Sequence, residues 1–139
     1  MVTLRLPSEL GYEKVAMASV AVVAKRMGFL PERIDDIKSA VAEACINAIE
    51  HGNGLDGVAP VTVELAVHGN CLEINVSDTG RNRMPTLLPR PGSSSCNRGW
   101  GLYLMQCLVD EFHIRQSPQG GNTICLRIKK QSCLQPHLN

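Results

Sequence analysis

Five stretches of the chain alternate between apolar and polar residues, which is the period of a strand with one buried face. The first is carried by Val2, Leu4 and Leu6. The two in the middle are separated only by Gly69-Asn70, and the last two flank Gln119-Gly120-Gly121-Asn122; both separators are typical of hairpin turns. The predicted strands cover residues 2–6, 61–68, 71–77, 112–117 and 123–129.

Apolar residues at helical spacing predict three helices between these strands. The first runs from Glu9 to about Met27 and ends at Gly28, and the second begins at Pro31 and runs to about His51. A third follows the only tryptophan, at position 100. This order of elements predicts an α/β two-layer sandwich of the α+β kind, with the helices on one face of a mixed, mainly antiparallel sheet.

Composition indicates one domain and excludes several classes of protein. A chain of 139 residues with 44% hydrophobic content can bury one core, so we expect a single domain over 1–130 and a flexible polar tail over 131–139. A net charge of +1 with no basic run gives no reason to expect nucleic acid as a partner. The chain has neither a signal peptide nor an apolar run of about 18 residues, which predicts no membrane association and a cytoplasmic location.

Six cysteines raise the question of disulfides, but two of them fall within predicted helices and no secretory signal precedes them. We therefore expect reduced thiols. Cys45 lies on the apolar side of the second predicted helix and is expected to belong to the core.

The second predicted helix carries an acid and an amide one turn apart, Glu43 and Asn47. Residues four apart lie on the same helix face, so the two side chains project together beside an apolar stripe. A carboxylate next to an amide can hold a hydrated divalent ion and orient a nucleophile. For a lone E-x-x-x-N, an exposed face with an incidental pair is the simpler interpretation, so the hypothesis needs partners elsewhere in the chain.

Two further motifs follow in order. Asp78-Thr79-Gly80 comes directly after a predicted strand, so an acid stands where the chain must turn. The segment Arg98-Gly99-Trp100-Gly101-Leu102 leads into the third helix. Glycines let backbone N–H groups approach an anion closely, and a helix N-terminus adds partial positive charge, so this segment is a candidate phosphate cradle. Considered alone, each of these two motifs is more simply explained as a turn or a tight loop.

With Gly121-Asn122-Thr123 on the last hairpin, these motifs resemble, in their order, those of the GHKL ATPase superfamily, and most closely those of the anti-sigma-factor serine/threonine protein kinases. The resemblance spans nearly the whole chain and implies a Bergerat-type, histidine-kinase-like ATPase fold. It also implies ATP and Mg²⁺ as cofactors.

The resemblance implies a role for each matching residue. Glu43 would be the general base, Asn47 would ligate Mg²⁺, Asp78 would accept a hydrogen bond from the adenine amino group, and Thr123 would support Asp78 or a bridging water. Gly99 and Gly101 would offer backbone donors to the phosphates. The residues expected to bind nucleotide are Asn47, Asp78, Gly80, Arg98, Gly99, Trp100, Gly101, Leu102 and Thr123.

Two of these residues also have simpler interpretations. Arg98 could reach a β- or γ-phosphate, although an arginine at the end of a loop is more often solvated. Trp100 could shield the phosphates or contact a partner, and packing of the following helix explains it equally well.

One departure and one coincidental motif bear on this resemblance. The family commonly writes its first glycine box D-x-G-x-G, whereas this chain has Asn82 at the second glycine; asparagine tolerates left-handed backbone geometry, so nucleotide binding is expected to survive more readily than turnover. The proline- and serine-containing segment 81–98 is expected to be a lid over the nucleotide. Residues 52–57 fit G-x-G-x-x-G, but they follow a helix and precede a strand, so they are interpreted as a helix stop and a turn.

The resemblance implies that the protein phosphorylates a small anti-anti-sigma (STAS-type) protein and has a sigma factor as its second partner. We expect the reaction to occur in trans, because the first strand begins at Val2 with no phosphoacceptor helices before it. The helix at 9–27 or the lid would contact the sigma factor, and family habit suggests a homodimer. Two alternatives stay open. One is a nucleotide-binding regulatory module without phosphotransfer, and the other is a histidine-kinase-type ATPase module acting in a complex.

Overall fold

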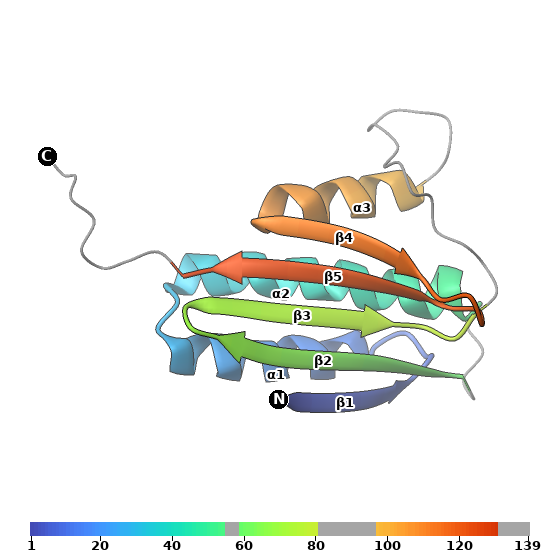
Figure 1. The fold of residues 1–139 in the computed structure, drawn as a ribbon, viewed down its shortest axis with the longest axis horizontal. Helices are drawn as coiled ribbons and strands as arrows, with labels where there is room; N and C mark the ends of the chain where they lie inside the picture. The colour runs from blue at the N-terminus through green and yellow to red at the C-terminus, as the bar shows by residue number, and fades with distance from the viewer. Residues whose placement is uncertain (55–58, 81–96, 131–139) are drawn as a thin grey trace, which may run out of the picture.

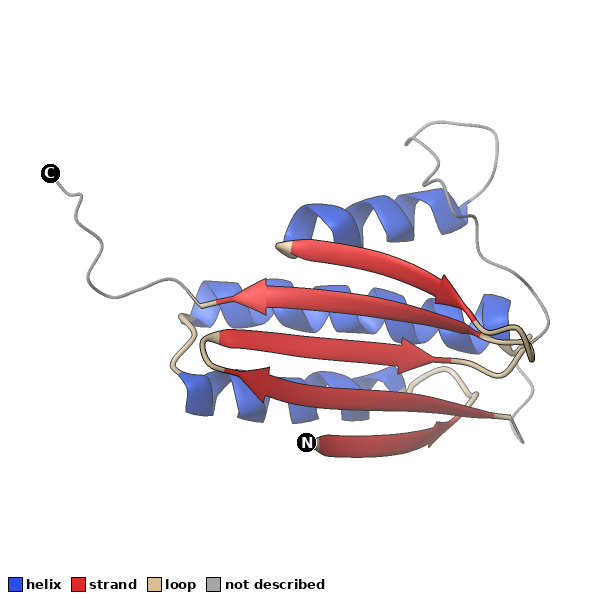
Figure 2. Ribbon diagram, viewed as in Figure 1, coloured by secondary structure: helices blue, strands red, loops and turns tan. Residues whose placement is uncertain are grey.

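The computed structural model describes residues 1–54, 59–80 and 97–130, which form one sheet and one layer of helices. The elements, in chain order, are β1 (Val2–Pro7), α1 (Glu13–Met27), α2 (Pro31–Asn47), the short π-helix η1 (Ala48–Gly52), β2 (Pro60–His68), β3 (Cys71–Ser77), α3 (Asn97–Leu108), β4 (Glu111–Gln116) and β5 (Asn122–Lys129). The helices all lie on the same face of the sheet (Figures 1 and 2). The predicted two-layer sandwich is therefore confirmed. The expected tail at 131–139 lies outside the described residues.

The sheet has the strand order β1-β2-β3-β5-β4, and every pairing among its described strands is antiparallel. The sequence predicted a mixed, mainly antiparallel sheet, so the parallel component is a correction. Its physical reason is the position of the last strand. β3 and β4 run in the same direction, but β5 lies between them and pairs antiparallel with both.

The ends of the first helix follow from its glycines. α1 begins at Glu13 rather than at the predicted Glu9, because Gly11 adopts a left-handed backbone (φ 109°) and its N–H donates to Glu13 Oε1 at 2.7 Å. At the other end Gly28 is also left-handed (φ 93°), and the N–H of Phe29 donates to the Ala24 carbonyl at 3.1 Å. The predicted helix stop at Gly28 is confirmed.

The core lies between the two layers and is built from the alternation seen in the sequence. Each inward apolar residue of the central strands contributes about 1.5–3 kcal/mol to stability by burial. A shift of the pairing register of a central strand by one residue would therefore expose several of these side chains to water. The inward residues of the three central strands are Val61, Val63, Leu65, Leu72, Ile74, Val76, Ile124, Leu126 and Ile128, all at most 2% exposed. They meet small residues of the helices, among them Ala16, Val20, Ala40 and Ala44.

Cys45 is part of this core, as predicted, and burial raises the pKa of its thiol to about 12. The four cysteines among the described residues are free thiols.

Four segments that are distant in sequence end at the same side of the molecule. They are the C-terminal end of α2 with η1, the end of β3, the start of β5 and the N-terminal end of α3 (Figure 1). Every motif selected from the sequence lies on one of these segments. Among the described residues, no helix has the length and apolar content needed to span a bilayer.

Candidate functional site

The acid and the amide of α2 face the glycine segment of α3. The Asn47 side chain is 4% exposed, and its Nδ2 donates to the Glu43 carbonyl at 3.0 Å. A Cβ added at Gly101 would lie 2.6 Å from Glu43 Oε1 and 3.4 Å from Asn47 Nδ2. The absence of a side chain at position 101 therefore lets α3 approach the Glu43–Asn47 face of α2 closely.

The surroundings of Glu43 shift the pKa of its carboxyl group. Partial burial raises the pKa of the Glu43 carboxyl above its usual range, and the nearby Glu50 carboxylate in η1 raises it further. A carboxylate with a raised pKa holds a proton more readily, which suits a group that accepts one during a reaction near neutral pH. Because the Asn47 amide nitrogen is used within the helix, its oxygen is the atom that could bind a hard cation such as Mg²⁺.

Asp78 is a buried carboxylate at the end of β3, only 5% exposed. Its Oδ1 accepts from the backbone N–H of Gly80 at 3.0 Å and of Asn122 at 3.1 Å, and the Asn122 amide donates to Oδ2 at 3.3 Å. These donors hold the carboxylate in a fixed orientation. Such a group can accept a further hydrogen bond from a ligand with a well-placed donor.

Three glycines allow the backbone to close around Asp78. A Cβ at Gly52 would overlap the Asp78 carboxylate, a Cβ at Gly80 would overlap the Gly52 carbonyl, and a Cβ at Gly121 would overlap the Asp78 carbonyl. Gly121 also has a left-handed backbone, with φ of 96°. The sequence identified Gly52 only as a helix stop; the structure shows that it is also a point of close approach.

Asn53 is a buried residue that sequence reasoning missed. Its Oδ1 accepts from the Thr79 N–H at 3.0 Å, and its Nδ2 donates to Ser8 Oγ at 2.8 Å and to the Pro60 carbonyl at 3.1 Å. It therefore ties the turn after β3 to the end of η1 and to the chain around β1 and β2. No local pattern signals this role, because Ser8 and Thr79 are 45 and 26 residues away in the sequence.

In the last hairpin, Asn122 contacts Asp78 through its side chain, whereas Thr123 pairs with another strand residue. The Thr123 hydroxyl pairs with Ser77 Oγ at 2.9 Å, in register with it across β3 and β5. The residue whose side chain contacts Asp78 is Asn122, which is 2% exposed. Asn122 stands one position before Thr123, the residue that the resemblance implies as a support for Asp78 or for a bridging water.

The second glycine motif lies within α3, which begins at Asn97. The first N–H groups of a helix have no partners within it, so this segment offers backbone donors from a helix rather than from a preceding loop. Trp100 is 57% exposed and meets the Tyr103 ring edge-on at 6.4 Å, whereas Leu102 is fully buried and packs in the core. The Arg98 side chain, Asn82 and the predicted lid up to residue 96 lie outside the described residues.

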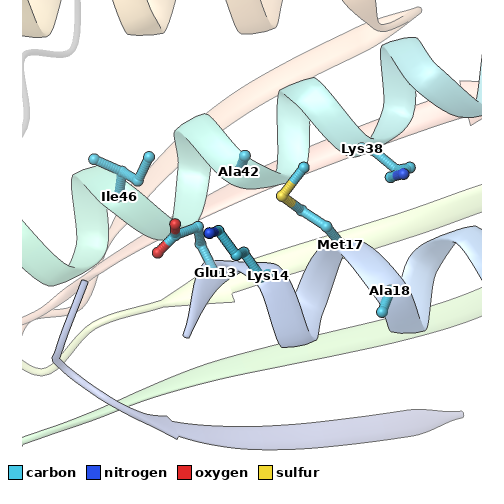
Figure 3. A pocket seen from close by; sticks show the side chains of 7 residues that line it. All are labelled: Glu13, Lys14, Met17, Ala18, Lys38, Ala42 and Ile46. Atoms are coloured by element: carbon cyan, nitrogen blue, oxygen red, sulfur yellow. The ribbon is translucent and has the colours of Figure 1, made fainter. Parts of the chain in front are cut away.

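A groove of about 350 Å³ lies elsewhere, between α1 and α2 (Figure 3). None of the site residues predicted from the sequence lines it. Its walls are formed by Glu13, Lys14, Met17, Ala18, Lys38, Ala42 and Ile46.

Comparison with known proteins gives one family and a consistent set of relatives. A family model described as the histidine kinase-like ATPase domain matches residues 6–128. The chain is 34% identical over 126 residues to the serine-protein kinase RsbW of Bacillus pumilus (strain SAFR-032), with 83% of this chain and 78% of that protein covered. It is 31% identical over 134 residues to the serine-protein kinase RsbW of Bacillus subtilis (strain 168), with coverage of 90% and 82%.

Solved structures show the same fold. The structure of the RsbU and RsbW domains of Rv1364c from Mycobacterium tuberculosis matches with a TM-score of 0.68 at 23% identity, over 94% of this chain and 33% of that one. This chain thus spans about a third of that longer chain. The catalytic domain of histidine kinase ThkA matches with a TM-score of 0.57 at 13% identity, over 94% of this chain and 98% of the other. The Bergerat-type fold expected from the motifs is therefore confirmed.

Proposed function

Because this chain belongs to the histidine kinase-like ATPase family, together with the RsbW serine-protein kinases, we propose that it is an ATP-dependent protein serine/threonine kinase. In this proposal it binds Mg-ATP and phosphorylates a small anti-anti-sigma protein. A sigma factor is its second partner, held or released by partner switching. The cytoplasm, where sigma factors act, is the location that follows from these partners.

The observation that supports this proposal best is the continuity of the helix that joins the two halves of the site. At Glu43 and Asn47 this helix faces Gly101 of α3, and at Gly52 it contacts the Asp78 carboxylate. Gly52 comes nine residues after Glu43, a separation of about 13 Å at 1.5 Å per residue. An extended nucleoside triphosphate can bridge such a span, with its base at Asp78 and its phosphates at α3.

Each half suits its end of the nucleotide. At the base end, Oδ2 of Asp78 would accept from the adenine amino group, while the two backbone donors and Asn122 hold the carboxylate in place. A charge-assisted hydrogen bond of this kind contributes about 1.5–3 kcal/mol. At the phosphate end, the first turn of α3 would offer N–H groups and the positive end of the helix dipole.

Phosphoryl transfer then needs mainly positioning and neutralisation of charge. Mg²⁺, held by the Asn47 oxygen and by phosphate oxygens, would supply that neutralisation. Glu43 would accept the proton of the incoming serine or threonine hydroxyl while the γ-phosphoryl group passes to its oxygen and ADP leaves. The raised pKa of Glu43 fits this role.

The groove between α1 and α2 supports the expectation that the first helix contacts a protein partner. Its lining includes the apolar side chains of Met17 and Ile46 and two lysines, Lys14 and Lys38, with Glu13 as its one acidic residue (Figure 3). The neighbouring Val22 of α1 is 60% exposed. We propose this surface for one of the two regulatory partners, with acidic residues on the partner facing the lysines.

The kinase proposal is tested by incubating the protein with Mg²⁺, γ-labelled ATP and candidate anti-anti-sigma proteins. Glu43→Gln should keep ATP binding and lose transfer of the label, and Asp78→Asn should weaken ATP binding and reduce transfer with it. Glu64→Gln is the matched control, because it makes the same change on the sheet face away from the helices, and it should do neither. Binding of ATP without transfer to any candidate partner would instead assign the chain to the regulatory modules that bind nucleotide without phosphorylating.

A further inference from the structure

A network centred on Arg33 joins the far end of α3 to α2. The Arg33 guanidinium donates to the carbonyl of Leu108, the last residue of α3, at 2.7 Å, and to Asp110 Oδ2 at 3.2 Å. A weaker pair with Asp36 on the same helix face lies at 3.5 Å. We call Arg33, Leu108 and Asp110 the Arg33 clamp.

The clamp satisfies groups that the helix itself leaves without partners. The last carbonyls of a helix have no intrahelical donor, and the dipole makes that end negative, so a cation placed there is bound favourably. Asp110 extends the clamp to the sheet, because its Oδ2 also accepts from the Lys129 N–H of β5 at 2.7 Å. Arg33 thus fixes the end of α3 to α2 and, through Asp110, to the last strand.

The opposite end of α3 carries the glycine that faces the site. α2 and α3 run antiparallel, since Arg33 near the start of α2 meets Leu108, and Glu43 near its end meets Gly101. Leu102 and Met105, both fully buried, fill the space between these two contacts. α3 is therefore held at both ends, and its position at Gly101 depends on how it is seated at Leu108.

From this geometry we infer that Arg33 is a positioning residue for the site, acting through α3. It cannot contact the nucleotide itself, because it lies 14 residues before Asn47 on the same helix, about 21 Å away at 1.5 Å per residue. When the clamp is broken, the C-terminal end of α3 loses its anchor, and the spacing between Gly101 and Glu43 is no longer held. This inference rests on the proposed use of that spacing for Mg-ATP.

The test compares Arg33→Met, which keeps the apolar stem but removes the donors, with Arg33→Lys, which keeps one charged donor. Arg127→Met is the matched control, because Arg127 also makes two ion pairs, to Glu73 at 3.5 Å and to Glu111 at 3.6 Å, but on the sheet face away from the helices. Two readouts are taken at a temperature where all variants are fully folded: amide hydrogen exchange of residues 101–104, and titration with Mg-ATP.

We expect Arg33→Met to exchange faster at residues 101–104 and to bind Mg-ATP about three- to tenfold more weakly. Arg33→Lys should recover part of both losses, and Arg127→Met should match the wild type. Unchanged exchange at residues 101–104 in Arg33→Met would overturn the inference, whatever the nucleotide result. If the wild type binds no Mg-ATP, the proposed function fails, while the exchange data still decide whether Arg33 positions α3.

Discussion

Substitution of Gly101 by alanine adds one methyl group, and it should lower the rate of catalysis while leaving the protein folded. In Gly101→Ala the added Cβ would begin 2.6 Å from Glu43 Oε1. An unstrained contact needs about 3.3–3.5 Å, so the carboxylate or α3 must move by roughly 0.7–0.9 Å. The Glu43 side chain can give way, because its oxygen is the far end of a flexible, partly exposed group.

Stability should therefore change little, whereas the rate of phosphoryl transfer should fall. Alanine is better than glycine inside a helix by about 0.8–1.0 kcal/mol, which offsets the cost of displacing Glu43, so we expect the melting temperature to stay within about 4 °C of the wild type. A displacement approaching 1 Å at a reacting group can cost about a hundredfold in rate. We expect kcat for phosphoryl transfer to fall about 10- to 100-fold, which corresponds to about 1.4–2.7 kcal/mol of transition-state stabilisation.

The assay is steady-state transfer of labelled phosphate to a phosphoacceptor protein, with calorimetric titration of Mg-ATP alongside. Affinity should change less than kcat, because the base end of the site is untouched. A double-mutant cycle with Glu43→Ala isolates the contact: once the carboxylate is removed, Gly101→Ala should stabilise the apo protein by more than it does in the wild type. Wild-type kcat in folded Gly101→Ala would refute the reasoning.

Three further changes test the remaining parts of the site. Asp78→Asn should weaken Mg-ATP binding about 10- to 150-fold by calorimetry, because one charge-assisted hydrogen bond is lost, and unaltered affinity would count against the adenine assignment. Asn122→Ala should lower the free energy of unfolding in urea by about 1–2 kcal/mol, since it removes a buried donor to Asp78. The pKa of Glu43 is higher in the folded protein than in the unfolded chain, so protonation of Glu43 favours the folded state. This stabilisation is fully present below the pKa of the unfolded chain and is lost as the pH rises through the pKa of the folded protein. Without nucleotide, Glu43→Gln should therefore have a higher melting temperature than the wild type at pH 7. The rate of phosphoryl transfer by the wild type should decline as the pH falls through the raised pKa of Glu43. A rate that does not depend on pH in this range would contradict the general-base role.

The elements that periodicity predicted correctly are those whose signals are local. The strands at 61–68 and 71–77 alternate residue by residue, and the helix that begins at Pro31 carries a continuous apolar stripe, so burial alone specifies them. The start of α1 was predicted four residues early, because the apolar spacing gave no weight to the left-handed backbone of Gly11. The parallel component of the sheet was wrong for a different reason. It depended on where the last strand inserts, and strand order is a property of the whole fold.

The same distinction separates the site residues that could be predicted from those that could not. Glu43 and Asn47 are one turn apart, so their common face follows from helix geometry. Asn53 and Asn122 contact the turn after β3 from 26 and 44 residues away, and only the folded chain brings them there. Gly52 was read as a helix stop, since its close approach to Asp78 exists only in three dimensions.

The two ends of the site also differ in how far they depend on the core, which constrains how the activity can be altered. At the base end, the Asp78 N–H donates to the Asn122 carbonyl at 2.9 Å, and its side chain is enclosed by backbone from three separate segments, so the atoms proposed to read adenine also close the fold. At the phosphate end, Glu43 is only partly buried, and it lies close to α3 at Gly101. Changes at the base end should therefore reduce stability and binding together. Changes at Glu43 or Gly101 should reduce or abolish phosphoryl transfer in a protein that still folds and still binds nucleotide. If phosphorylation drives partner release, such variants should keep their partner bound.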